Sequence, residues 1–361
     1  MSIRDLIIVG AGPSGLSAAI AARQRGLDYL VLEQGILVNS IYRFPPQMVF
    51  FTTPELLEIG GLPFVSPYEK PTRAEALKYY RKVVDTYDLR IAFEEKVLSI
   101  QREDAAADKA RGSGSGGDGS SEMRLFEVET LSARGVRRSR LARFVALAIG
   151  YYDHPNMIHV PGEDLPHVSH FYSEPHPHYR QRVVIVGGGN SAAEAALEMH
   201  RAGAHVTLVH RHQALKPTIK YWVRPDIENR IKEGSVAARF GRCVKEIRPT
   251  SIVITPSDEA AGVAEANEAG GAGGADEEIA ADAIYLLTGY RADTDLMCRA
   301  GIRLTDRQGP VYDLETFETN VPNLFVIGGA IAGVETGTIF IENGRFHGEK
   351  IIEVIASRTA G

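Results

Sequence analysis

In the first 33 residues, two short apolar runs flank a glycine-rich turn and an alanine-rich stretch. A short continuous apolar run, LIIV at 6–9, is followed by a glycine-rich turn, an alanine-rich stretch at 14–26 and a second apolar run at 29–33. Apolar runs without polar alternation are typical of parallel strands, because such strands are buried on both faces. The pattern therefore predicts a βαβ unit at the start of the chain.

The same order of apolar and polar positions returns in the middle of the chain. The run VVIVG at 183–187 precedes a glycine turn, a stretch NSAAEAALEMHRAG at 190–203 and the run HVTLVH at 205–210. This pattern predicts a second βαβ unit. Gly26 and Gly203 occupy the position just past each helix, where glycine commonly ends a helix.

Two low-complexity inserts interrupt the chain at 103–122 and 258–278. Both are rich in Gly, Ala, Ser and acidic residues, a composition that favours mobility over a packed core. The strand-like segments KVLSIQ and RLFEVETL flank the first insert, and SIVITP and ADAIYLLTG flank the second. We therefore expect two lengthened hairpin tips, and no function is assigned to them.

The length of 361 residues favours two domains. A polar, proline-rich segment at 151–181 is the expected first crossing between them, and the chain is expected to return near 289–300. The C-terminal part contains a further strand, NLFVIGG, and a helix that begins near ETGTIF, which we expect to rejoin the first domain. We predict an α/β fold with one domain at 1–168 and 295–361 and a second domain inserted at 169–294.

The first glycine turn, GAGPSG, carries the features of a dinucleotide-binding loop. Gly10 allows the tight turn, Gly12 lets the backbone approach a pyrophosphate, and Gly15 permits close packing of the helix. Its helix N-terminus supplies N–H groups and partial positive charge. Glu33 ends the next strand, where an acid can accept hydrogen bonds from ribose hydroxyls. A purely structural glycine turn is the alternative interpretation.

The second glycine turn, GGGNSA at 187–192, has alanine in place of the third glycine, a known variant. The strand after it ends in HRH and not in an acid. Because Arg211 can pair with a 2′-phosphate that an acid would repel, we expect this site to prefer NADPH over NADH. In the alternative interpretation, Arg211 and Lys216 are only a solvated basic edge.

An acidic ribose position in the first site and a basic one in the second favour FAD in the first domain and NADPH in the second. Both domains are then Rossmann-like dinucleotide-binding domains, and the FAD-binding domain is discontinuous. The expected chemistry is a relay, in which hydride passes from NADPH to FAD and then to an acceptor.

Composition limits the partners. The net charge of −6 argues against nucleic acid, and no apolar run is long enough to span a bilayer. No signal peptide is evident, so we expect a cytoplasmic protein. Cys243 and Cys298 form no CxxC and no zinc spacing; we expect both to be small buried residues. The segment HFYSEPHPHY at 170–179 lacks a convincing ligand set, so no metal is predicted.

Beyond the glycine loops, longer segments resemble two-dinucleotide flavoproteins of the thioredoxin reductase group. ALAIGYYDHP at 146–155, LLTGYRADTD at 286–295 and TNVPNLFVIGG at 319–329 resemble the segments that close the nucleotide domains. The chain is more similar to the YpdA-type bacillithiol disulfide reductase family, in segments at 39–64, 70–84, 219–234 and 339–348. This resemblance implies FAD, NADPH, a homo-oligomer, reduction of bacillithiol disulfide, and a backbone contact from Val97 to the adenine end of FAD.

The chain departs from these relatives in three features, two of which concern the acceptor. Thioredoxin reductases carry a CxxC in the NADPH domain and an acid after the glycine of the third FAD segment, whereas this chain has no CxxC and has Gly329 there. Bacillithiol disulfide reductases resemble GGGPCG, with a cysteine proposed to take part in reduction. Ser14 occupies that position, and a hydroxyl cannot replace a thiolate in disulfide exchange. We expect Ser14 to cap the helix or to contact the pyrophosphate.

The predicted cofactor-binding residues form two sets. For FAD they are Gly10, Gly12, Pro13, Ser14, Gly15, Glu33, Gln34, Val97, Gly150 and Gly328; for NADPH they are Gly187, Gly189, Asn190, Ser191, Arg211, His212 and Gly289. No catalytic residue is assigned. Further candidates are His178 and Tyr179 near the nicotinamide, Tyr42, Phe50 and Phe51 at the flavin or in the core, and Glu342, Asn343 and Arg345 at the start of the final helix, where Arg345 would hold an anionic substrate group or form a structural ion pair.

Four functions remain open from the sequence. The leading prediction is an NADPH-dependent FAD oxidoreductase that reduces a low-molecular-weight disulfide such as bacillithiol disulfide. The alternatives are a ferredoxin or flavodoxin reductase, which needs no redox cysteine, a flavin monooxygenase, and a redox sensor without turnover. The acceptor is therefore expected to be a small-molecule disulfide or a small redox protein.

Overall fold

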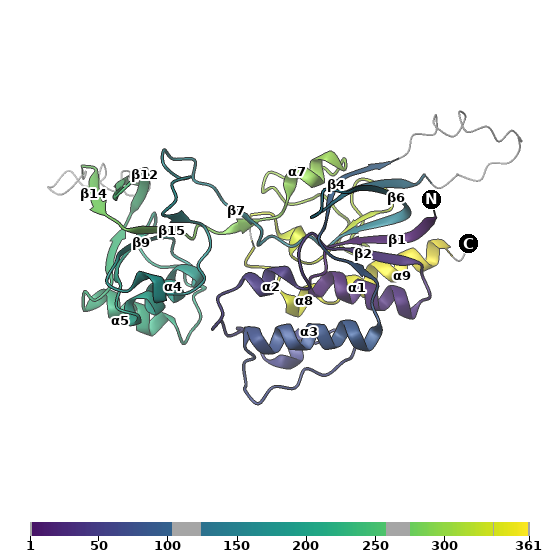
Figure 1. The fold of residues 1–361 in the computed structure, drawn as a ribbon, viewed down its shortest axis with the longest axis horizontal. Coiled ribbons are helices and arrows are strands. Elements are labelled where there is room, and N and C mark those ends of the chain that lie inside the picture. Colours follow the sequence, from purple (N-terminus) through teal and green to yellow (C-terminus); the bar gives the residue numbers. More distant parts are fainter. Residues whose placement is uncertain (1, 103–123, 258–274, 335, 360–361) are drawn as a thin grey trace, which may run out of the picture. The chain divides into compact units, whose positions relative to one another are not determined.

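A computed structural model describes residues 2–102, 124–257, 275–334 and 336–359 of the chain. The chain forms two compact units (Figure 1). Unit 1 consists of Met1–Arg43, Gln47–His154 and Tyr290–Gly361, and unit 2 of Phe44–Pro46 and Pro155–Gly289. Unit 1 is therefore discontinuous in sequence, and unit 2 is inserted into it.

The crossings between the units lie at 154/155 and 289/290, earlier than the predicted boundaries at 168/169 and 294/295. The first boundary was misplaced because β8 (Val168–Ser169) pairs with a strand of unit 2, β15 (Ala283–Leu286). At the second crossing, Ala292 and Leu296 already pack in the core of unit 1.

Unit 1 is built on a seven-stranded sheet with the strand order β3-β2-β1-β6-β5-β4, and β17 pairs with β6 beside this path. Neighbours among β1, β2, β3, β6 and β17 run parallel, whereas β4, β5 and β6 form an antiparallel meander. The strands are β1 (Ile3–Val9), β2 (Tyr29–Leu32), β3 (Ile91–Ala92), β4 (Glu95–Arg102), β5 (Phe126–Ser132), β6 (Arg137–Leu147) and β17 (Leu324–Val326).

Helices cover the parallel part of this sheet. Figure 1 shows α1 and α9 side by side below the strands, with α3 beyond them. On the opposite face, Leu296 and Met297 of α7 pack against β4 and β6. The helices of unit 1 are α1 (Pro13–Gln24), α2 (Asn39–Arg43), η1 (Pro54–Leu57), α3 (Arg73–Tyr87), α7 (Thr294–Arg299), η4 (Gly328–Ala332), α8 (Ile341–Gly344) and α9 (His347–Thr359).

Unit 2 has a five-stranded parallel sheet with the order β11-β10-β9-β15-β8. Its elements are η3 (His176–His178), β9 (Arg182–Val186), α4 (Asn190–Arg201), β10 (His205–His210), α5 (Arg224–Lys232) and β11 (Ala237–Phe240). Val183 and Ile185 pack towards α4 and α5, whereas Val184 and Val186 face a separate antiparallel sheet. Both faces of β9 are thus buried, as its continuous apolar run predicts.

The two predicted βαβ units are confirmed as β1-α1-β2 and β9-α4-β10, each with parallel strands. The helices end in the same way. Leu27 N–H donates to Ala22 O after α1, and Ala204 N–H donates to Met199 O after α4, with Gly26 and Gly203 at positive φ. Both ends are Schellman motifs.

Both low-complexity inserts fall largely outside the described residues. The first lies between β4 and β5, which pair as the predicted hairpin. The second prediction was partly wrong, because β13 (Ser251–Pro256) pairs with β14 (Glu277–Ala280) and not with ADAIYLLTG. The latter segment contains β15 of the parallel sheet. β12 (Arg242–Arg248), β13 and β14 form the separate antiparallel sheet.

The final helix begins later than predicted. The chain forms short α8, turns at Arg345 and Phe346, and only then begins α9 at His347. α9 is seated closely on α1, since a Cβ on Gly348 would overlap the backbone of Ala18. β7 (His154–Pro155) and β16 (Tyr290–Arg291) pair where the chain leaves and rejoins unit 1.

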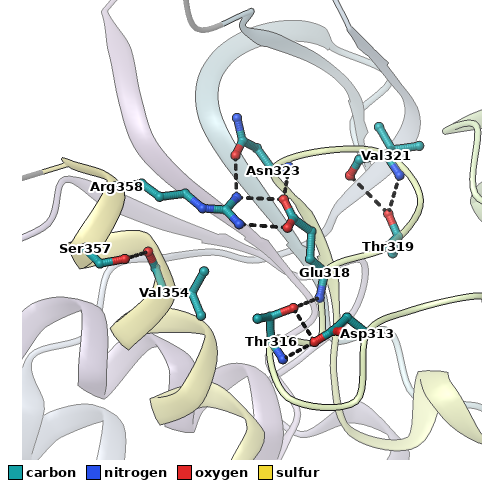
Figure 2. A network of polar contacts seen from close by, with 9 residues as sticks. All are labelled: Asp313, Thr316, Glu318, Thr319, Val321, Asn323, Val354, Ser357 and Arg358. Atoms are coloured by element: carbon teal, nitrogen blue, oxygen red, sulfur yellow. Dashed lines mark hydrogen bonds and ion pairs between the residues drawn. The ribbon is translucent and has the colours of Figure 1, made fainter. Parts of the chain in front are cut away.

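A polar network fastens the far end of α9 to the turn before β17 (Figure 2). Arg358 binds both carboxylate oxygens of Glu318, at 2.6 and 2.7 Å, and also donates to Asn323 Oδ1. Asn323 N–H donates to Glu318 Oε1 at 2.6 Å. The bond from Arg358 is the main cause that lowers the pKa of Glu318. The network therefore holds its carboxylate in the charged form.

Replacing Arg358 with methionine should lower the free energy of unfolding by about 1–3 kcal/mol, the usual range for charge-assisted hydrogen bonds. Because the pKa of Glu318 is depressed in the folded state, the stabilisation is present above its unfolded pKa of 4.5 and is lost as pH falls through the folded pKa. In urea titrations, the difference between parent and variant should shrink between pH 7 and pH 3. The control is Ser357→Ala, because the Ser357 hydroxyl donates to Val354 O within α9. A constant difference across this pH range would contradict the assignment.

Candidate functional site

The first glycine loop joins β1 to α1 at the carboxyl end of the unit 1 sheet. Gly10 has φ of +106°, and a Cβ there would overlap the carbonyl of Ala148, which follows β6. A Cβ on Gly15 would overlap Gly10 O. Side chains are therefore excluded at both positions by the packing of β1, β6 and α1 against one another.

Gly12 has a different environment. Its φ of −77° and ψ of 176° suit any residue, and a Cβ there would meet no described atom within 4 Å. Among the described residues, no side chain caps α1, and the first turn of this helix contains no acidic residue. The missing side chain at Gly12 thus leaves open space at an uncapped helix N-terminus. This arrangement fits the pyrophosphate of a dinucleotide.

Glu33 follows β2 and is buried beside the same loop. Its carboxylate accepts hydrogen bonds from Ala11 N–H and Gly35 N–H, both at 2.8 Å. Burial raises the pKa of Glu33, and these two bonds oppose that rise. The carboxylate is therefore oriented by the loop backbone, with lone pairs left for a ribose hydroxyl. The adjacent Gln34 donates to Asp153, which also pairs with Arg43 at 2.7 Å.

Ser14 is the second residue of α1, and Gly12 is the N-cap, so the expectation that Ser14 caps the helix was wrong. The side chain of Ser14 lies against two glycines. A Cβ on Gly328 would overlap Ser14 Oγ, and one on Gly344 would lie 3.1 Å from it. Ser14 is thus in contact with the segments that follow β17 and form α8.

Gly328 begins the turn after β17 and has φ of +63°, a left-handed conformation that glycine adopts without strain. Its N–H donates to Nδ1 of buried His347 at 3.1 Å. The sequence reasoning missed His347, although FHG lies within the segment at 339–348 that resembles the family. On the next residue, Gly329, a Cβ would lie 2.8 Å from the ring of Tyr151. An aromatic ring therefore fills the space beside the position where thioredoxin reductases carry an acid.

Val97 lies on β4 at a bulge, where the register with β5 shifts between Val97 and Ser99. Its side chain is buried with Val9 and Leu32 of β1 and β2. Glu95 N–H, two residues earlier, donates to Glu33 O at 2.8 Å. The start of β4 therefore lies beside Glu33, on the side of the site where a ribose would bind.

The second glycine loop, in unit 2, repeats the geometry of the first. A Cβ on Gly187 would lie 2.5 Å from Leu287 O, and one on Gly188 would overlap the ring of His210. Gly189 is again the open position, where a Cβ would meet only Lys216 Cδ, at 3.9 Å, among the described atoms. No described side chain caps α4, and its first turn has no acidic residue. Unit 2 therefore also fits a pyrophosphate.

Asn190, at the start of α4, fastens a neighbouring loop. Its Oδ1 accepts from Lys220 N–H at 2.8 Å, and its Nδ2 donates to Thr218 O. Lys220 in turn pairs with Glu194 of α4 at 2.7 Å. The side chain of Asn190 is thus used within the protein, whereas that of Ser191 is exposed.

The basic residues after β10 lie at the same edge of unit 2. Arg211 is exposed, and its Nε donates to His212 Nε2 at 3.2 Å. Lys216 is also exposed, and its N–H donates to Gly188 O in the glycine loop. Lys216 therefore lies beside the open face of Gly189, and Arg211 follows β10 at the same edge of the sheet, an arrangement that favours a ligand with an additional phosphate.

Gly150 follows β6 of unit 1, and Gly289 follows β15 of unit 2. Both have positive φ, of +61° and +99°. Gly289 O accepts a hydrogen bond from Asn156 N–H within unit 2. Each glycine therefore lies where the chain turns away from the carboxyl end of its sheet.

His178 and Tyr179 lie at one edge of the unit 2 sheet, and their proximity to a nicotinamide stays a prediction. Tyr179 packs on Gly203, the residue before Ala204 and β10, at the edge where the strands of unit 2 begin. The glycine loop is at the opposite edge, after β9. His178 bonds to Gln181 and, at 2.7 Å, to Tyr285 OH. These residues tie the entry segment to the sheet.

Arg345 forms no ion pair with a described carboxylate, so the structural alternative was wrong, whereas its contact with an anionic substrate group stays a prediction. Its Nη1 donates to Glu55 O and Glu58 O, both at 2.7 Å. The Asn343 side chain also forms hydrogen bonds with the backbone: it accepts from Phe340 N–H and donates to Thr338 O. Glu342 is half-buried on α8 and raises the pKa of Tyr151, although burial is the larger cause.

The aromatic candidates divide by exposure. Phe50 is buried, whereas Phe51 and Tyr42 are 55% and 51% exposed. Lys70 lies over the ring of Phe51, and Arg73 lies over that of Tyr42. Phe50 belongs to the core of unit 1, and the other two rings lie at its surface.

Both cysteines were expected to be buried, and this prediction was wrong for Cys298 on α7, which is exposed. Cys243, on β12, is partly buried. In the described part of the chain, no group of three or more His, Cys, Asp and Glu residues is placed to hold a metal ion. No described helix is long and apolar enough to cross a membrane.

Comparison with known proteins agrees with this geometry. The model of the family described as pyridine nucleotide-disulphide oxidoreductase matches residues 7–108 and 120–328. The chain is 36% identical to bacilliredoxin reductase Bdr of Bacillus subtilis (strain 168), over 98% of this chain and 97% of that protein.

Two solved structures of bacillithiol disulfide reductase Bdr (YpdA) are similar to the structure of this chain. The Bacillus cereus protein has a TM-score of 0.87 at 36% identity, covering 99% of this chain and 100% of that one. The Staphylococcus aureus protein has a TM-score of 0.85 at 33% identity, covering 99% of each chain.

Proposed function

This chain belongs to the pyridine nucleotide-disulphide oxidoreductase family, in the group of the Bdr (YpdA) proteins, and on this premise we propose that it reduces bacillithiol disulfide with NADPH through bound FAD. The observation that carries the proposal is the similarity to Bdr proteins over nearly the whole length of both chains. The region of similarity covers both units and both glycine loops.

FAD is assigned to unit 1 and NADPH to unit 2. Support for FAD comes from the open position at Gly12 and from the oriented carboxylate of Glu33. Support for NADPH comes from the open position at Gly189, with Lys216 beside it, and from exposed Arg211 at the end of β10. When bound, FAD supplies the chemistry that takes hydride from NADPH and passes two electrons to a disulfide.

The chain's own residues bind and orient in this proposal. The residues that would hold FAD are Gly10, Gly12, Pro13, Ser14, Gly15, Glu33, Gln34, Val97, Gly150 and Gly328. Those that would hold NADPH are Gly187, Gly189, Asn190, Ser191, Arg211, His212 and Gly289. For Asn190 the proposal now concerns its backbone N–H, because its side chain fastens the loop at Thr218 and Lys220.

The acceptor is proposed to react without a protein thiol at position 14. A serine hydroxyl cannot form the mixed disulfide through which thiol exchange proceeds. Cys243 and Cys298 lie in different units, on β12 and α7. The name of the Bacillus subtilis relative favours a second candidate acceptor, an oxidised bacilliredoxin. The homo-oligomer that the family resemblance implies stays a prediction.

Anaerobic mixing with NADPH tests the first half of the proposal. The flavin absorbance should bleach, and a spectrum that stays oxidised would overturn the proposed enzyme. Steady NADPH consumption should then follow addition of bacillithiol disulfide. Consumption only with oxidised bacilliredoxin would select the second acceptor. Consumption only with ferredoxin or flavodoxin, or only with oxygen and an oxygenated product, would favour the reductase or monooxygenase alternatives.

Replacing Ser14 with alanine should leave kcat/KM for bacillithiol disulfide within about threefold of the parent. The substitution removes only Oγ, which packs on Gly328 and Gly344, and such a small change at a half-buried position costs little. The measurement is NADPH oxidation with the flavin content determined in the same sample. A loss of about a hundredfold with FAD still bound would show that the hydroxyl takes part in the reaction.

A further inference from the structure

His347 is a buried histidine that none of the preceding assignments uses. It is the first residue of α9, and its ring stacks on Phe317 with centroids 4.2 Å apart. Burial is the main cause that lowers the pKa of His347 to about 4, and Lys350 adds to it. The ring is therefore neutral at pH 7. Its Nδ1 accepts the hydrogen bond from Gly328 N–H, which places the ring proton on Nε2.

Gly328 is held from two sides. On one side, its amide is bound to His347 of α9 at 3.1 Å. On the other, the space that a side chain at Gly328 would take is filled by Ser14 of α1. The turn after β17 is thus fixed between the first turn of the glycine-loop helix and the first turn of α9.

The position of His347 is itself fixed by α1. The next residue, Gly348, has no room for a side chain against the backbone of Ala18. Arg345, two residues before His347, accepts a hydrogen bond at its carbonyl oxygen from Ser17 Oγ at 2.5 Å. Ser17 and Ala18 therefore hold the segment that carries His347, and His347 in turn holds the Gly328 amide.

We propose that His347 is a positioning residue for FAD. The Nδ1 atom of His347 holds the Gly328 amide, so that the turn after β17 stays closed against Ser14 and the N-terminus of α1. The inference rests on the assignment of FAD to unit 1. Without an acceptor at this place, the buried amide of Gly328 is left unpaired, which the turn relieves by moving away from α9. That movement shifts Gly328, one of the residues proposed to hold FAD, relative to the glycine loop.

Two substitutions at the same site separate the hydrogen bond from the volume of the ring. In His347→Leu a methyl group replaces Nδ1, whereas in His347→Asn the Oδ1 atom takes the same place and can accept from Gly328 N–H. Phe317→Leu is the matched control, because it removes the stacked ring and keeps the acceptor. FAD is titrated into each apoprotein by flavin fluorescence, and amide exchange is measured on the peptide that contains Gly328.

His347→Leu should raise the Kd for FAD by about 5- to 100-fold and speed exchange at Gly328, and His347→Asn should restore both to within about threefold. Phe317→Leu should lower the melting temperature without changing either readout. Unchanged FAD binding in His347→Leu, or equal loss in the leucine and asparagine variants, would overturn the inference. Turnover with NADPH and bacillithiol disulfide is measured separately, so that a parent that binds FAD but does not reduce the disulfide contradicts only the proposed function.

Discussion

Replacing Gly12 with valine is expected to give a folded protein that no longer holds FAD. The backbone at Gly12, with φ of −77° and ψ of 176°, accepts an L-residue without strain. A Cβ there meets no described atom within 4 Å. The added side chain would instead occupy the space in front of the first N–H groups of α1, where the pyrophosphate is proposed to bind. We expect affinity for FAD to fall by at least about a hundredfold, since backbone contacts to phosphate are lost together.

The same substitution at Gly189 provides the matched experiment. Gly189→Val should retain FAD and its yellow colour, but NADPH should no longer bleach the flavin at concentrations that saturate the parent. Thermal melts in the absence of cofactor should show both variants folded. Gly10→Ala should behave differently and fail to fold stably, because its Cβ would overlap the Ala148 carbonyl. Loss of FAD from Gly189→Val, with Gly12→Val unaffected, would reverse the assignment of the two units.

Replacing Arg211 with glutamate should weaken NADPH binding by about 1–3 kcal/mol, or about 5- to 150-fold in KM, because a charge-assisted contact to the 2′-phosphate is lost. Binding of NADH, which lacks this phosphate, should change much less. The preference for NADPH over NADH should therefore fall or invert. The measurement is the rate of anaerobic flavin reduction as a function of either nucleotide.

Arg224→Glu is the control for net charge. Arg224 is partly exposed on α5, where it pairs with Glu228 within its own helix. This variant should keep the nucleotide preference of the parent. An unchanged KM for NADPH in Arg211→Glu would remove Arg211 from the site and leave it as a solvated basic edge.

The two glycine loops could be predicted because their chemistry is local. Gly10, Gly12 and Gly15 lie within six residues, between an apolar run and a helix, and the required turn is determined by that short segment alone. The same holds for Gly187 and Gly189. Glu33 could also be placed, since parallel strands bring their carboxyl ends to one edge of a sheet.

The contacts of the C-terminal segment could not be predicted, because they join residues distant in sequence. Arg345 binds the carbonyls of Glu55 and Glu58, and no pattern near Arg345 indicates those partners. His347 is coupled to Ser14 through Gly328, a residue distant in sequence from Ser14. The strand EEIA was missed for another reason. Its two acidic residues resemble the insert before it, and pairing with β13 overrides that composition.

The discontinuity of unit 1 has a consequence for biosynthesis. All strands of unit 2, from β8 to β15, leave the ribosome before β17 and α9 are made. Unit 2 can therefore fold during translation. The earlier part of unit 1 cannot complete its sheet until β17 is made. Until then, one edge of β6 is unpaired at Val145–Leu147, where β17 later pairs. Nascent chains stalled before β17 should thus acquire protease resistance in the inserted unit first, and the exposed edge of β6 is the place at which chaperones would be needed.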